Sequence, residues 1–177
     1  MNCFNILTLV FAGGTALGTL GLAVFAFFQI HQVTKEQQLK RKYEIVEFAK
    51  NASEWRFKDV DNDYYEKSEQ PWIASNFIIM NHIIAITNIM RSGHIISNTL
   101  SGKKNAEIKR KVDTLLSELM ALRMNLIELR NKIDYTAGRK TIPPEFKAQL
   151  DIILAQSEKV HYAGEILFGE VAKRRGV

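Results

Sequence analysis

The chain has 177 residues and a formal net charge of +5 at pH 7, and 46% of its residues are hydrophobic. A single cysteine excludes a disulfide framework, which suits a reducing compartment. The Leu, Ile and Phe content suffices for one folded core, so we expect one domain besides any membrane segment.

The first feature in chain order is a run without charged side chains, from Asn5 to Ile30. As a helix, its roughly 25 apolar residues would measure about 37 Å, which exceeds the bilayer core of about 30 Å. We therefore predict that residues 1–33 form an N-terminal transmembrane helix and that residues 34–177 form a separate helical domain.

The flanks of this run favour an uncleaved anchor over a secretory signal. No Lys or Arg precedes it, it is longer than the 7–15 apolar residues typical of a signal, and it ends in bulky phenylalanines. Basic residues follow it at Lys35, Lys40, Arg41 and Lys42. The positive-inside rule then places the N-terminus outside and residues 34–177 in the cytoplasm.

The run also carries two patterned faces. Polar and hydroxyl side chains form one stripe, at Asn5, Thr8, Thr15 and Thr19. Glycines form a neighbouring ridge, at Gly14, Gly18 and Gly21. A ring of identical helices would use the glycines for close contact and the stripe to line a wet lumen. The alternative is that Gly, Ala and Thr are simply common in transmembrane helices.

Helical periodicity continues beyond the membrane segment. Residues 34–57 form a predicted helix that continues the membrane helix and places apolar residues near one face, at Leu39, Ile45, Phe48, Ala52 and Trp55. Residues 59–70 are polar, which indicates a loop, and Pro71 suits the first turn of the next helix. Residues 72–92 are apolar nearly all round, which favours a buried central helix. A strand or a second membrane crossing is the alternative for this segment.

Two heptad patterns complete the chain. The first comprises Ile108, Val112, Leu115, Leu119, Leu122, Leu126, Leu129 and Ile133, and the second Phe146, Leu150, Ile153, Ser157, Val160, Gly164, Leu167 and Val171. Residues 134–144, with Gly138, Pro143 and Pro144, mark a helix stop and a new start. Two long antiparallel helices follow, and with the earlier helices they predict an all-α, up-down four-helix bundle.

Metal and cofactor chemistry finds no support in the sequence. Asp59, Asp61 and Asp63 open like a calcium loop, but Tyr64 and Gln70 occupy the positions that need Gly and Glu. The four histidines lack zinc-ligand spacing, and no glycine-rich phosphate loop or nucleophile elbow occurs. We expect no metal and no cofactor.

One catalytic pattern remains on the last predicted helix. The HEPN ribonucleases carry an Arg followed by a His after four to six residues, and the segment from Gln156 to His161 resembles this motif with Gln in place of Arg. In that family the His acts as acid or base at the RNA 2′-hydroxyl while the Arg stabilises phosphate charge. Basic clusters lie at 103–104, 109–111 and 173–175, and they suit anionic headgroups or RNA.

Four features occur together in this chain: the membrane helix, its stripe from Thr8 to Thr19, the glycine ridge and the degenerate Gln156–His161 pair. In this combination the chain resembles the small membrane-bound accessory protein of type VI-B CRISPR systems. The resemblance implies a HEPN-like cytoplasmic domain and a ring-shaped pore in the bacterial inner membrane. It further implies that the pore enhances antiviral defence by an RNA-guided nuclease, which would be a partner. The alternatives are a membrane-tethered ribonuclease that uses His161 and a non-catalytic membrane scaffold.

Overall fold

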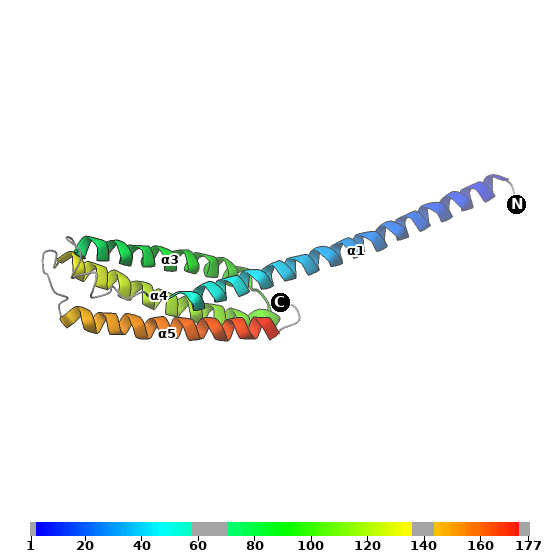
Figure 1. Ribbon diagram of the computed structural model, residues 1–177. Helices are drawn as coiled ribbons and strands as arrows, with labels where there is room; N and C mark the ends of the chain where they lie inside the picture. Colours follow the sequence, from blue (N-terminus) through cyan, green and yellow to red (C-terminus); the bar gives the residue numbers. More distant parts are fainter. Residues whose placement is uncertain (1–2, 58–70, 136–143, 174–177) are drawn as a thin grey trace. The chain divides into compact units, whose positions relative to one another are not determined.

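The computed structural model describes the backbone of residues 3–57, 71–135 and 144–173. Side chains are described for residues 18–57, for 76–133 except Lys104, and for 146–173. These ranges contain four α-helices and no strand, which confirms the all-α prediction (Figure 1). The helices are α1 (Cys3–Glu54), α3 (Pro71–Thr99), α4 (Ala106–Tyr135) and α5 (Pro144–Lys173), with a 3-10 turn, η1 (Lys103–Asn105), before α4.

The chain divides into two compact units, Met1–Lys40 and Arg41–Val177. The described part of the first unit is helical throughout, and every side chain from Gly18 to Gln37 is exposed. Its apolar side chains include Leu20, Leu22, Phe25, Phe27 and Phe28, all more than 60% exposed. Among the residues whose side chains are described, no helix includes a stretch long and apolar enough to cross a membrane.

The second unit is a bundle in which α4 packs against both α3 and α5, and the three helices lie side by side (Figure 1). The last turns of α1 join this bundle through Ile45, Phe48, Ala49 and Ala52, which are all buried. Burying each large apolar side chain stabilises the fold by about 1.5–3 kcal/mol, so the helix faces are selected mainly by packing.

The heptad prediction for α4 is confirmed, because all eight of its positions from Ile108 to Ile133 are at most 3% exposed. The predicted face of α5 is buried as well, with Leu150 only partly so. Helices α3 and α5 both begin at a proline, Pro71 and Pro144. Proline lacks the N–H that a first-turn residue leaves unpaired, which explains both starts.

Two glycines allow close approach between helices. A Cβ atom at Gly164 of α5 would lie 2.9 Å from the carbonyl oxygen of Ala49 and 3.0 Å from the nitrogen of Ser53. A Cβ atom at Gly93 of α3 would lie 2.6 Å from the ring of Phe48 and 2.7 Å from Leu116. The end of α1 therefore packs where both neighbouring helices lack a side chain.

Three predictions about individual segments need correction. Leu39, predicted on the buried face, is 68% exposed, because burial on α1 begins only at Ile45. The segment predicted as 72–92 continues to Thr99. It is buried on one face only and leaves Phe77 and Ile84 exposed. The predicted loop at 59–70 and most of the predicted connection at 134–144 lie outside the described residues.

Candidate functional site

His161 of α5 lies against the C-terminal end of α1. Its Nδ1 atom is 2.8 Å from the carbonyl oxygen of Ser53 and 3.0 Å from Nη2 of Arg56. Its other ring nitrogen, Nε2, is 3.5 Å from Oε1 of Glu165, one turn further along α5. The imidazole therefore joins α5 to the last turn of α1 and to the residues that follow it.

The two contacts of Nδ1 need opposite protonation states. A protonated Nδ1 donates to the carbonyl of Ser53, whereas an unprotonated Nδ1 accepts from the guanidinium of Arg56. In each tautomer one of these hydrogen bonds forms and the other cannot. In both cases, α5 stays tied to the end of α1.

Arg56 also covers the unpaired carbonyls at the end of α1. Its Nη1 atom donates to the carbonyl oxygen of Ser53 at 2.6 Å and to that of Trp55 at 3.0 Å. The last carbonyls of a helix have no partner within the helix and carry its negative dipole end, so a guanidinium is well suited to this place. The contact has a structural role whatever else the site does.

A cavity of about 460 Å³ opens beside this cluster. It is lined by Lys50, Ser53, Glu54, Arg56, His161, Glu165 and Phe168. Lys50 and Glu54 lie 3.7 Å apart, so part of the charge in the cavity is paired internally. The lining combines basic side chains, an imidazole and two carboxylates with the ring of Phe168. Across the described residues, no cluster of His, Cys, Asp and Glu is arranged to hold a metal ion.

Gln156 does not share this cavity with His161. Its side chain is buried against α4, where Nε2 donates to Oε2 of Glu118 at 2.6 Å and to the carbonyl oxygen of Glu118 at 3.2 Å. The two candidate residues thus contact different helices. The cation beside His161 is Arg56, which sequence reasoning missed because it comes from another part of the chain.

The predicted pore and association residues are described only in part. Thr19, Gly18 and Gly21 are exposed, and a Cβ atom at either glycine would meet nothing within 4 Å. The side chains of Asn5, Thr8, Gly14 and Thr15 lie outside the described residues. The glycine positions that can be inspected therefore have free space around them in the single chain.

The basic cluster at 109–111 is largely engaged within the bundle. Lys109 lies 3.3 Å from Asp113 and donates to the hydroxyl of Ser97 at 2.7 Å, while Lys111 lies 3.2 Å from Glu170 of α5. Paired lysines are weaker attractors of anions than free ones. Lys104 and residues 174–175 of the other two clusters lie outside the described side chains.

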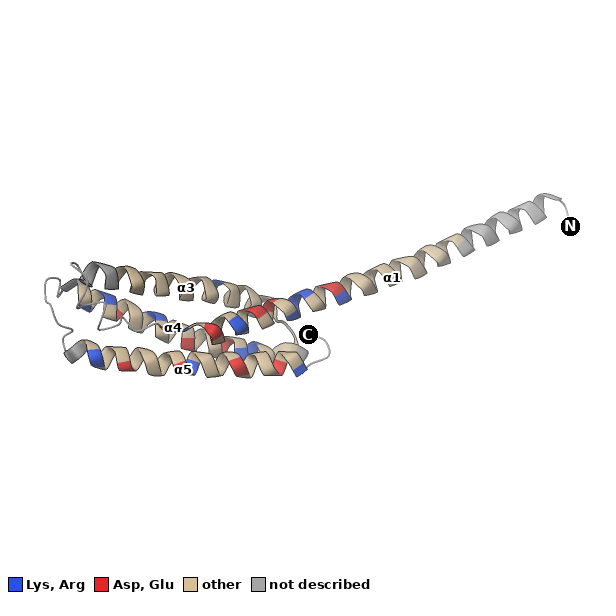
Figure 2. Cartoon of the chain, in the orientation of Figure 1, with Lys and Arg blue, Asp and Glu red and all other residues tan. Residues whose placement is uncertain are grey.

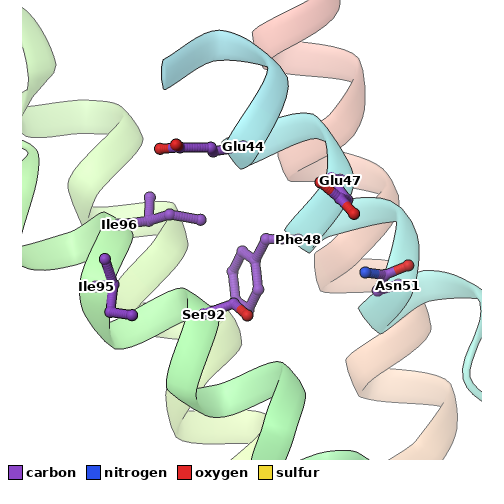
Figure 3. Close-up of a pocket in the computed structure, with 7 residues that line it drawn as sticks. All are labelled: Glu44, Glu47, Phe48, Asn51, Ser92, Ile95 and Ile96. Atoms are coloured by element: carbon purple, nitrogen blue, oxygen red, sulfur yellow. The ribbon is translucent and has the colours of Figure 1, made fainter. Parts of the chain in front are cut away.

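A second cavity, of about 270 Å³, lies between α1 and α3 (Figure 3). In Figure 3, Glu44, Glu47 and Asn51 line it from α1, and Ser92, Ile95 and Ile96 line it from α3, with Phe48 between them. Acidic side chains on one wall and isoleucines on the other give an open groove without a catalytic combination of groups.

Comparisons with known protein families, with characterised proteins and with solved structures find no match for this chain.

Proposed function

We propose that this protein is a membrane-anchored homo-oligomer whose N-terminal helix makes the membrane permeable. The observation that carries the proposal is the continuous exposure of apolar side chains on α1, from Leu20 to Val33. Exposed apolar surfaces of this extent mark membrane or protein contacts. Residues 6–30 carry no charge, although their side chains are described only from Gly18 on. An uncharged apolar stretch of this length favours a lipid bilayer as the surroundings of the helix.

The glycine ridge and the hydroxyl stripe extend the proposal from an anchor to a pore. A monomeric anchor has no use for glycine, since Leu packs equally well against lipid. Gly18 and Gly21 have free space around them, which leaves room for a neighbouring helix to approach closely. Thr15 and Thr19 would then face the lumen, where hydroxyl groups replace part of the water around a passing ion.

The biological role that we propose follows from the resemblance to the accessory proteins of type VI-B CRISPR systems. The pore would lie in the bacterial inner membrane with residues 34–177 in the cytoplasm. It would depolarise the membrane and so enhance antiviral defence by an RNA-guided nuclease.

Dye leakage from vesicles that contain the full chain tests the pore. We expect the double variant Thr15→Leu and Thr19→Leu to lose most of the leakage while the protein inserts normally. Val24→Leu serves as the matched control and should leak normally, because Val24 lies about 180° around the helix from Thr15 at about 100° per residue. Unchanged leakage in the double variant would rule out a lumen lined by these threonines.

A ribonuclease is the second candidate, and the contact of Arg56 with His161 favours it. The guanidinium supplies the cation that Gln156 lacks, at 3.0 Å from the imidazole. In such an enzyme His161 would move the proton of the RNA 2′-hydroxyl, and Arg56 would stabilise the charge on the phosphate. Cleavage of RNA by the purified protein, lost in both His161→Ala and Arg56→Ala at unchanged helix content, would support it. Absence of cleavage by the native protein would refute it.

A plain scaffold is the third candidate. It predicts that an unpatterned apolar helix can replace residues 6–30 without loss of function. A swap that preserves membrane insertion but abolishes leakage would refute the scaffold and support the pore.

A further inference from the structure

Two rows of exposed side chains recur at heptad spacing on opposite outer helices of the bundle. The α3 row is Phe77, Met80, Ile84, Asn88, Arg91 and Ile95, and the α5 row is Ile152, Ala155, Lys159, Tyr162 and Ile166. The large apolar members of the two rows are between 36% and 68% exposed. Steps of three or four residues, as in both rows, place the side chains on one helix face.

Neither row belongs to the core. The buried faces of the same helices are separate sets, represented by Ile79, Ile83 and Ile86 on α3 and by Ile153, Val160 and Leu167 on α5. Each of the two helices thus carries a second, mostly apolar face outside the core, and Ile95 at the end of the α3 row also lines the groove between α1 and α3. An apolar face that continues for several turns is typical of a helix that packs against another chain.

The charges around the two rows are complementary. Between Pro71 and Thr99, α3 has no acidic residue, and its only Lys or Arg is Arg91, as Figure 2 shows for the coloured part of this helix. Arg91 is exposed, and its side chain has no hydrogen-bond or ion-pair partner within the described ranges. A guanidinium in an apolar row, without a partner in its own bundle, is suited to a carboxylate on another molecule.

Carboxylates lie directly beside the α5 row at intervals of two helical turns. Asp151, Glu158 and Glu165 recur at intervals of seven residues, and all three are exposed. Glu165 lies near His161, whereas Asp151 and Glu158 form no ion pair with any residue that the structure describes. The α5 row therefore has carboxylates directly beside it, which the α3 row lacks, while its one charged member is Lys159.

We propose that the α3 row of one copy packs against the α5 row of a second copy, with Arg91 paired to Asp151 or Glu158. The inference rests on the self-association in the proposed function and names the surface that produces it. A contact between two α3 rows would leave both arginines without a carboxylate, because α3 has no acidic residue, whereas a contact with α5 supplies one. A head-to-tail contact between different rows closes into a ring when the rotation between neighbours divides a full turn, and a pore requires such a ring.

Cysteine cross-linking of the full chain in nanodiscs tests the pairing. In a Cys3→Ser background, chains with Ile84→Cys are mixed with chains with Tyr162→Cys and treated with a short bismaleimide. We expect the mixture to give at least ten times more cross-linked dimer than either variant alone. Cross-linking of one variant with itself at equal yield would overturn the proposal in favour of a symmetric contact.

Charge reversal provides an independent test. Arg91→Glu should shift the assembly toward monomer, and Glu158→Arg or Asp151→Arg in the same chain should restore it. Arg110→Glu, which reverses an exposed cation outside both rows, is the matched control and should assemble normally. A chain that is oligomeric in nanodiscs but neither cross-links nor responds to Arg91→Glu would overturn this interface and leave the pore proposal intact. A monomeric native chain would overturn both.

Discussion

Nη2 of Arg56 lies 3.0 Å from Nδ1 of His161, although 105 residues separate the two in the chain. The same guanidinium donates to the carbonyl oxygen of Ser53, which also lies 2.8 Å from the imidazole. The guanidinium that caps α1 and the imidazole therefore form one cluster, where the last turn of α1 meets α5.

This cluster predicts that Arg56 and His161 are energetically coupled. We expect Arg56→Ala and His161→Ala to destabilise the bundle by less in combination than the sum of the single changes. The coupling energy should be about 0.5–1 kcal/mol, because the pair is partly exposed and screened by solvent. Urea unfolding of the single and double variants measures it, and strict additivity would show that the contact contributes nothing.

Gly164 should tolerate no side chain. We expect Gly164→Ala to destabilise the bundle by about 1–3 kcal/mol, because the added Cβ atom would lie 2.9 Å from a backbone oxygen of α1. Gly169→Ala on the same helix is the control, since a Cβ atom there meets nothing within 4 Å. Thermal unfolding followed by circular dichroism should show the control at or above the stability of the native chain. Equal losses in both variants would contradict the close packing of α1 on α5.

Two neighbouring residues of α4 should differ sharply in their contribution to stability. Leu119 is fully buried, so Leu119→Ala should cost about 2–5 kcal/mol in free energy of unfolding. Met120 is 45% exposed, and Met120→Ala should cost less than about 1 kcal/mol. Chemical denaturation compares the two, and a similar loss at both positions would mean that α4 presents a different face to the core.

A small polar cluster should hold α3 to the start of α4. The buried hydroxyl of Ser97 donates to Asp113 at 2.5 Å and accepts from Lys109 at 2.7 Å. We expect Ser97→Ala to destabilise the bundle by about 1 kcal/mol, since both partners are partly exposed and can return to water. Ser92→Ala, at an exposed serine of the same helix, should change stability by less than about 0.5 kcal/mol. Equal losses of stability in the two variants, measured by urea unfolding, would contradict this role of Ser97.

Much of the bundle could be predicted from the sequence. The α4 seam from Ile108 to Ile133 steps by four and three residues in turn, so its period identifies the buried face. Pro71 and Pro144 indicate helix starts by the same local chemistry that the structure follows. Both signals depend on residues close together in the chain, which is why they are reliable.

The prediction for α3 was less accurate for a physical reason. A helix with Ile, Met and Phe on most sides has no polar face from which the buried direction could be read. Only packing against α4 and the end of α1 decides that Ile79 and Ile86 are buried while Phe77 and Ile84 remain exposed. Leu39 was misassigned because helical period alone cannot tell where along α1 the core begins.

The candidate site was the least predictable part. His161 was identified from a spacing rule within one helix, and that rule pointed to Gln156, which instead contacts Glu118 on α4. Arg56 reaches His161 only through the packing of α1 on α5, and no local pattern encodes that contact. A long-range pair of this kind becomes visible only in the folded bundle.

The mass of the full chain in lipid nanodiscs, measured by native mass spectrometry, tests the proposed self-association in a membrane most directly. We predict a single narrow species at a multiple of 20.2 kDa, inserted in the bilayer through residues 6–30. Gly18→Ile should reduce the copy number without unfolding the bundle, because this position has free space in the single chain. A chain that remains a 20.2 kDa monomer in the nanodisc, or that does not enter it, would contradict a pore-forming assembly.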